Sequence, residues 1–188
     1  MNFKKIILLF LVLGYCVGAS CQNFQSHLVG GVLATQIDGD DFGGYNKPGL
    51  YFGAGLSLPL SEKTSFAWDL IFIQKGSRRT NSTFYYLYRL SYLELPVYLD
   101  FKIWNNFSLQ AGGAVGYLVS ARFDSGFGFT NERFRLRKTD FSGLFGASYK
   151  FNEKWSFSAR WERSMISIHS ATWFVNRALV ASVKLSLN

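Results

Sequence analysis

The stretch 90-LSYLELPVYLDFKI-103 alternates between large apolar residues and polar or ring-bearing residues along almost its whole length. Successive side chains of an extended strand point to opposite faces. One face here carries Leu93, Leu95, Val97, Leu99, Phe101 and Ile103. The other carries Tyr92, Glu94, Pro96, Tyr98, Asp100 and Lys102. The stretch therefore predicts a strand with one face in an apolar medium and the other among polar groups.

Three further segments repeat this period of two: 49-GLYFGAGLSLPL-60, 107-FSLQAGGAVGYLVSAR-122 and 179-LVASVKLSL-187. Their second face is built mainly from Gly, Ser, Ala and ionisable residues, which fill the core of a soluble sandwich poorly. Such residues suit the narrow polar lumen of a membrane barrel whose outer face is apolar. Since lipid offers no partner for backbone polar groups, a sheet in lipid must close on itself.

Polar breaks set the number of strands. Short breaks lie at 61–63, 104–106 and 152–154, and longer ones at 37–47, 77–84, 123–135 and 169–174. Three short turns and four long loops predict eight strands with both termini on the short-turn side. We therefore expect an all-β fold: an eight-stranded antiparallel up-and-down transmembrane β-barrel with short periplasmic turns and longer extracellular loops.

The N-terminal segment has the layout of a secretory signal peptide: two lysines, an apolar run over 6–13, and small residues before Gln22. We expect cleavage after Cys21, or after Ala19, which gives a signal peptide at 1–21 and a barrel domain at 22–188. A lipid-modified Cys21 is an alternative, but Gly18 stands where that signal needs a branched apolar residue. Cleavage after Cys21 leaves no cysteine, which excludes a disulfide scaffold.

Aromatic residues make up 18% of the chain and gather beside the breaks. Next to the short turns are Phe66, Trp68, Trp104, Phe107, Phe151, Trp155 and Phe157. Next to the long loops are Tyr45, Tyr85, Tyr86, Tyr88, Phe123, Trp173 and Phe174. Because such rings favour the membrane–water interface, the two sets predict two aromatic girdles. Ordinary core aromatics of a soluble barrel are the alternative.

Ionisable residues on the polar faces predict a charged lumen. The expected network comprises Asp69, Glu94, Asp100, Lys102, Asp140, Lys150, Arg160, Glu162 and Lys184, with Lys75 also at an inward position. Unpaired charges in a narrow lumen are costly, and eight strands leave an interior that side chains just fill. We therefore expect a salt-bridged plug; an ion-conducting path is the alternative.

Basic residues near the long loops predict a positively charged outer rim, in a chain of formal net charge +8. An exported protein rarely meets nucleic acid, so outer-membrane lipid is the expected partner. Arginine forks suit phosphate, and lipopolysaccharide carries phosphate. The possible lipopolysaccharide contacts are Lys75, Arg78, Arg79, Arg133, Arg135, Arg137 and Lys138, with Arg89 and Arg122 on the same side. A solvated rim that keeps the loops apart is the alternative.

Four segments also resemble the PorT-type outer-membrane barrel family, a group of small porin-like barrels of Gram-negative bacteria. They are 36-QIDGD-40, 44-GYNKPG-49, 74-QKGSR-78 and 92-YLELP-96. The resemblance implies an eight-stranded barrel in the cell outer membrane. Some members of that family are tied to a machinery that secretes proteins, which makes envelope or secretion proteins the expected protein partners.

No motif indicates an enzyme, a cofactor or a metal site. The chain has two histidines, His27 and His169, which fall at opposite ends of the predicted barrel. It contains no phosphate-binding glycine loop, no CxxC pair and no zinc-ligand spacing. We therefore expect a non-enzymatic structural or interaction component of the cell envelope. The alternative function is a narrow passive porin-like channel for small solutes or ions.

Overall fold

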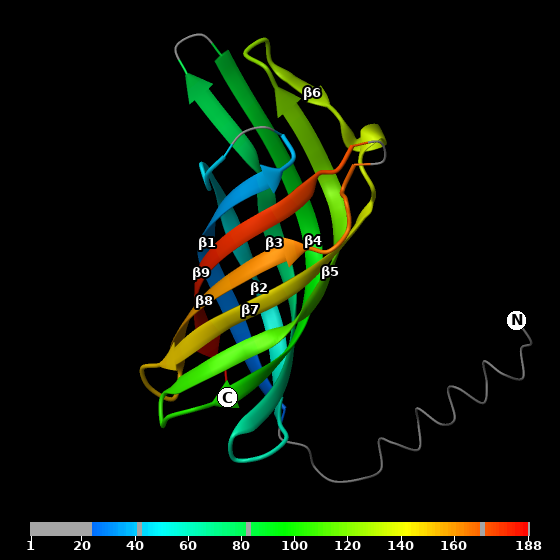
Figure 1. Cartoon of the computed structure of the whole chain (residues 1–188). Coiled ribbons are helices and arrows are strands. Elements are labelled where there is room, and N and C mark those ends of the chain that lie inside the picture. Colours follow the sequence, from blue (N-terminus) through cyan, green and yellow to red (C-terminus); the bar gives the residue numbers. More distant parts are fainter. Residues whose placement is uncertain (1–23, 41–42, 82–83, 170–171, 188) are drawn as a thin grey trace, which may run out of the picture.

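The computed structural model describes residues 24–40, 43–81, 84–169 and 172–187, and the expected signal peptide at 1–21 lies outside these residues (Figure 1). The main strands are β1 (Gln25–Asp38), β2 (Lys47–Pro59), β3 (Thr64–Asn81), β4 (Phe84–Lys102), β5 (Phe107–Asp124), β7 (Thr139–Lys150), β8 (Trp155–Ser164) and β9 (Val175–Ser186). A short strand β6 (Phe129–Asn131) and a 3-10 turn η2 (Arg133–Arg135) lie between β5 and β7. None of the helical segments described is long and apolar enough to cross a membrane.

The eight main strands form a closed antiparallel ring in the order β1–β2–β3–β4–β5–β7–β8–β9 (Figure 1). The ring closes where β1 pairs with β9, over a register that runs from His27↔Ser186 to Asp38↔Val175. β4 pairs with β5 along nearly their full length, with one irregularity at Ser91/Tyr92. β6 adds only to the outer end of β5. These pairings confirm the expected eight-stranded barrel.

Burial follows the predicted alternation. On β4, the outward residues Leu93 and Leu95 are each 44% exposed. Glu94, which lies between them, and Tyr98, further along the same inward face, are each 1% exposed. The same outward pattern runs around the ring and forms a belt of exposed apolar side chains, here called the apolar belt. Its members include Leu28, Val32, Leu50, Phe52, Leu70, Leu93, Leu95, Val115, Tyr117, Phe141, Phe145, Trp161, Leu179 and Val183. An outward apolar surface of this kind is what a lipid-exposed barrel requires.

The short turns lie where the sequence placed them, at 60–63, 103–106 and 151–154. The prediction of a long loop at 77–84 is wrong, because β3 and β4 continue as paired strands through Arg79↔Tyr86 to Asn81↔Phe84. Tyr86 and Tyr88 pack their rings against Phe123 of β5, with centroids 5.2 and 5.7 Å apart. Aromatic cross-strand packing stabilises a sheet, and here it extends the strands past a polar sequence break.

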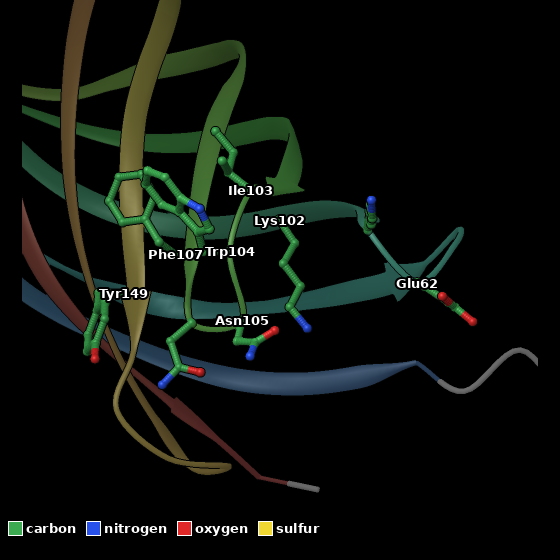
Figure 2. Close-up of a pocket in the computed structure, with 9 residues that line it drawn as sticks. Glu62, Lys102, Ile103, Trp104, Asn105, Phe107 and Tyr149 are labelled. Atoms are coloured by element: carbon green, nitrogen blue, oxygen red, sulfur yellow. The ribbon is translucent and has the colours of Figure 1, made fainter.

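The periplasmic girdle is confirmed at several of its expected positions: Trp104 is 71% exposed, Phe151 62%, Trp155 45% and Phe157 39%. At the β4–β5 turn Trp104 lies beside Phe107 (Figure 2), and their ring centroids are 6.0 Å apart. The two rings line a hollow of about 830 Å³ together with polar side chains such as Glu62 and Lys102. Tyr149 of β7 lines the same hollow.

Glycines at the closing seam provide a test of this geometry. A Cβ on Gly31, which faces inward, would lie 2.2 Å from the backbone oxygen of Ala181, whereas a Cβ on the neighbouring Gly30 would meet nothing within 4 Å. We expect Gly31→Ala to destabilise the barrel by about 1–3 kcal/mol, the usual cost of overpacking. Urea unfolding of the barrel in lipid vesicles measures this change. Gly30→Ala is the matched control, and an equal effect of both substitutions would contradict the seam geometry.

Candidate functional site: a charged lumen beneath an apolar seal

Asp69 of β3 anchors the periplasmic half of the lumen and is fully buried. Its Oδ1 lies 2.8 Å from Nε2 of His27 on β1. Its Oδ2 accepts a hydrogen bond from the Tyr98 hydroxyl at 3.2 Å and lies 3.5 Å from Nη1 of Arg160. Residues from β1, β3, β4 and β8 therefore meet at one carboxylate, which holds the barrel walls together across the lumen.

Arg160 of β8 is 2% exposed and extends the same network. Its Nε donates to Gln110 Oε1 at 2.7 Å, and its Nη1 donates to the Tyr51 hydroxyl at 3.2 Å. The guanidinium carbon lies 4.1 Å from the centre of the Tyr98 ring, within the range of a cation–π contact. Lys184 of β9 adds a further contact, because its ammonium donates to the Tyr98 hydroxyl at 2.9 Å.

Above this layer, a single ammonium faces three carboxylates. Lys75 Nζ lies 2.6 Å from Glu94, 3.6 Å from Glu162 and 3.8 Å from Asp140. Asn176 Nδ2 donates to Asp140 Oδ2 at 3.0 Å. Glu94 Oε1, Asp140 Oδ1 and both Glu162 carboxylate oxygens are buried without a hydrogen-bond partner among the described residues. Lys75 is therefore the residue that compensates most of the negative charge at this level.

An apolar layer covers the network on the extracellular side. Leu136, from the loop before β7, and Ile168, from the loop after β8, are 6% and 1% exposed and belong to one core cluster with the strands beneath them. A β-bridge between Leu136 and His169 joins the two loops. Tyr86, Tyr88, Phe123 and Phe174 pack in or against this cluster. We call this layer the apolar seal.

The apolar seal corrects the expectation of an extracellular aromatic girdle. Tyr88 is 7% exposed and faces the core cluster instead of the membrane interface. Of the seven residues expected in this girdle, all of which the structure describes, Trp173 is the one that is exposed, at 64%.

The periplasmic end is more open. A cavity of about 180 Å³ enters the lumen there, lined among others by His27, Asp100, Lys150, Lys184 and several serine hydroxyls. We call it the periplasmic vestibule. Asp100 accepts a hydrogen bond from Gln110 Nε2 at 2.7 Å, which links the vestibule to the buried network.

The structure brings most of the expected lumen residues together. Buried in the network are Asp69, Lys75, Glu94, Asp140, Arg160 and Glu162, with Asp100 and Lys184 partly buried below them. Lys102 and Lys150 are exposed at the ends of their strands, outside the buried part of the network, and Lys150 lines the periplasmic vestibule. They lie where the strands emerge from the barrel, and a long side chain there reaches water.

Several polar partners were missed, among them Ser164, which donates to Asp140 Oδ2 at 2.9 Å. His27, Gln110 and Asn176 are each 1–3% exposed and hydrogen bond within the network. Each stands at an inward position of its strand, so the alternation that identified the charged residues could also have identified them.

The residues expected in the basic rim also fall into a buried group and an exposed group. Lys75 is buried in the lumen, so it cannot reach a molecule outside the wall. Arg78, Arg79, Arg135, Arg137 and Lys138 are exposed near the extracellular end, and Arg133 is partly buried. Arg135 pairs with Glu132 at 3.3 Å. The described residues contain no group of three or more His, Cys, Asp and Glu side chains arranged to hold a metal ion.

Comparison with known proteins agrees with this architecture. The structure is similar to the attachment invasion locus protein Ail of Yersinia pestis, at 14% identity and a TM-score of 0.56, over 87% of this chain and 98% of that one. It is also similar to Neisserial surface protein A, at 13% identity and a TM-score of 0.59, over 86% of this chain and 97% of that one. At these identities the likeness shows the fold alone. Comparison with curated proteins gives no match. A family model described as an outer membrane protein beta-barrel domain matches residues 10–170, so the chain belongs to this family of outer-membrane barrels.

Proposed function

We propose that the protein is a non-enzymatic structural and interaction component of the outer membrane, a plugged barrel that presents its extracellular surface to partners. The observation that carries this proposal is the pair of layers in the lumen: the apolar seal and, below it, the buried charge network. A solute crossing the barrel would have to displace both. Export after removal of residues 1–21 is part of the proposal.

The extracellular surface supports the interaction role. Exposed aromatic side chains stand out beyond the barrel, with Phe127 at 98%, Phe134 at 78% and Trp173 at 64% exposure. Exposed apolar groups next to basic ones are typical of binding surfaces, because aromatic and arginine residues are enriched there. The resemblance to the PorT-type family extends the proposal to a protein secretion assembly in the envelope.

Lipopolysaccharide is the lipid partner in this proposal. The basic rim is built from Arg78, Arg79, Arg133, Arg135, Arg137 and Lys138. Arginine side chains bind phosphate through paired N–H donors, and the outer leaflet presents phosphate at this height. One solved structure of Ail, to which this chain is 15% identical, is described in complex with the heparin analogue sucrose octasulfate, a sulfated sugar. That complex shows an anionic saccharide on a barrel of this shape.

A narrow passive channel is the second candidate, favoured by the periplasmic vestibule, which brings polar space into one end of the lumen. The two functions differ in conductance. We expect the wild-type barrel in a planar bilayer to show no steady open state, because the seal excludes water and ions. Leu136→Ser/Ile168→Ser, which makes the seal polar, is the comparison and should give more frequent openings. A stable wild-type current would overturn the plugged barrel and favour the channel.

Partners of the extracellular surface can be captured directly. Cross-linking in intact cells, followed by purification and mass spectrometry, should recover a reproducible envelope or secretion protein. The cross-links should fall on the loops that carry Phe127 and Phe134. Recovery of nothing beyond the barrel itself would contradict a role in a protein assembly.

The plug should also stabilise the fold. Lys75→Met leaves Glu94, Asp140 and Glu162 without their cation, and breaking a buried ion pair costs about 3–5 kcal/mol. We expect the urea midpoint of the folded barrel to fall accordingly, and Lys75→Met/Glu94→Gln to recover part of the loss. Lys102→Met, at the exposed periplasmic rim, is the control. Equal midpoints for Lys75→Met and Lys102→Met would show that the network does not stabilise the barrel.

A further inference from the structure

Two pairs of arginines face each other on the outer wall, directly above the apolar belt. Arg163 of β8 stands opposite Arg177 of β9, and Arg89 of β4 stands opposite Arg122 of β5. Like charges directly opposite each other destabilise a sheet. Each pair therefore needs a negative charge nearby.

The Arg163–Arg177 pair has a negative charge nearby within the protein, the carboxylate of Asp38. Arg177 Nε donates to Asp38 Oδ1 at 2.8 Å, and its Nη2 lies 2.8 Å from the same oxygen in an ion pair. Arg163 Nη2 lies 3.9 Å from Asp38 Oδ2, and Gln36 Nε2 donates to Oδ1 at 2.8 Å. A single carboxylate from β1 thus bridges two opposed arginines on the outside of the barrel.

The Arg89–Arg122 pair has no bridging carboxylate like Asp38 among the described residues. Over the residues that the structure describes, no acidic group lies within ion-pairing distance of Arg89, Arg122 or the nearby Arg133. Asp124, on the same strand as Arg122, uses its Oδ1 to accept backbone N–H groups of Gly126 and Gly128 at 2.8 and 3.1 Å. Three cations therefore share this part of the wall without an ion pair to any carboxylate of the described residues.

Aromatic rings position two of these cations. The Arg89 guanidinium lies 5.3 Å from the centre of the Phe129 ring, and that of Arg133 lies 5.8 Å from the centre of the Tyr117 ring. Arg133 Nη2 donates to the Tyr117 hydroxyl at 3.3 Å. The Arg133 Nε is buried and has no hydrogen-bond partner among the described residues, so a donor remains unused at a site with excess positive charge.

A pocket of about 290 Å³ lies between these groups. Arg122, Phe129, Asn131 and Arg133 line it together with Val119 at the edge of the apolar belt. Val115 and Val119 are 45% and 48% exposed on the same outward face of β5. A molecule whose acyl chains lie along this face would carry its head group to the height of the pocket.

We propose that this pocket, here called the phosphate pocket, binds a phosphate group of an outer-leaflet glycolipid through Arg122 and Arg133, which line it, and through Arg89, which stands opposite Arg122 beside it. The phosphate takes the place that the Asp38 carboxylate takes on the opposite wall. The inference rests on the proposed lipopolysaccharide partner and gives it a defined site. The exposed arginines of the rim are not part of this site.

Lipopolysaccharide binding to the barrel in detergent tests the proposal, with purified lipopolysaccharide as the probe. We expect Arg89→Gln/Arg122→Gln to weaken binding about tenfold, because charge-assisted hydrogen bonds to phosphate are lost. Arg163→Gln/Arg177→Gln is the matched control: it removes the same two charges from an equivalent position where Asp38 already supplies the anion, and it should leave affinity unchanged. The slower gel mobility of boiled samples checks that each variant is folded.

Two further probes identify the source of the anion. Lipopolysaccharide stripped of its phosphates should bind wild type and Arg89→Gln/Arg122→Gln alike. Sucrose octasulfate, a soluble anion without acyl chains, should bind wild type more weakly than lipopolysaccharide; equal binding would overturn the assignment to a lipid. Arg89→Lys/Arg122→Lys keeps the charge but loses the paired donors, and should bind with intermediate affinity.

The outcomes separate this inference from the proposed function. Wild type that binds lipopolysaccharide, with an equal loss in both double variants or in neither, would overturn the phosphate pocket and leave the basic rim as the partner surface. Wild type that binds no lipopolysaccharide would overturn the pocket and the lipid partner together. The conductance and cross-linking results test the plugged barrel independently of either.

Discussion

The pairing of β1 with β9 is the constraint on which the rest of the structure depends. In a bilayer each unpaired backbone N–H or C=O costs several kcal/mol, roughly the strength of a lost hydrogen bond in an apolar medium, so the first and last strands must meet. That closure fixes the diameter of the ring, and a ring of eight strands leaves space for side chains alone. Glycine at position 31 allows the seam to close because any Cβ there would meet the backbone of β9.

A narrow lumen in turn determines its chemistry. Alternation turns every second residue inward, and the lipid-facing positions must be apolar, so the polar residues of each strand are forced into one small volume. Charges in that volume are tolerated only when each finds a partner. Asp69 and Arg160 are held by groups from four other strands, whereas Lys75 is the one cation that lies beside Glu94, Asp140 and Glu162 among the described residues. The lower layer is therefore the better satisfied of the two, and the upper layer is the more sensitive to loss of a single residue.

The barrel and much of its lumen could be predicted from the sequence, because a period of two is a local signal that survives folding. Glu94 is identified as inward by Leu93 and Leu95 alone. Features set by contacts between distant segments could not be predicted in this way. The segment 77–84 looks like a loop until Tyr86 and Tyr88 are packed against Phe123. The same contacts turn these aromatic side chains toward the core, whereas the sequence had predicted that they lie at the membrane interface. The Asp38 bridge joins residues 139 positions apart, and no spacing in the chain indicates it.

The apolar seal closes the barrel at its extracellular end, and the periplasmic vestibule leaves it open at the other end. The vestibule opens the polar groups that line it, among them His27, Asp100 and Lys184, to the periplasm, and the seal separates them from the cell exterior. The outer surface can meet a changing environment without transmitting it to the charges that hold the strands together.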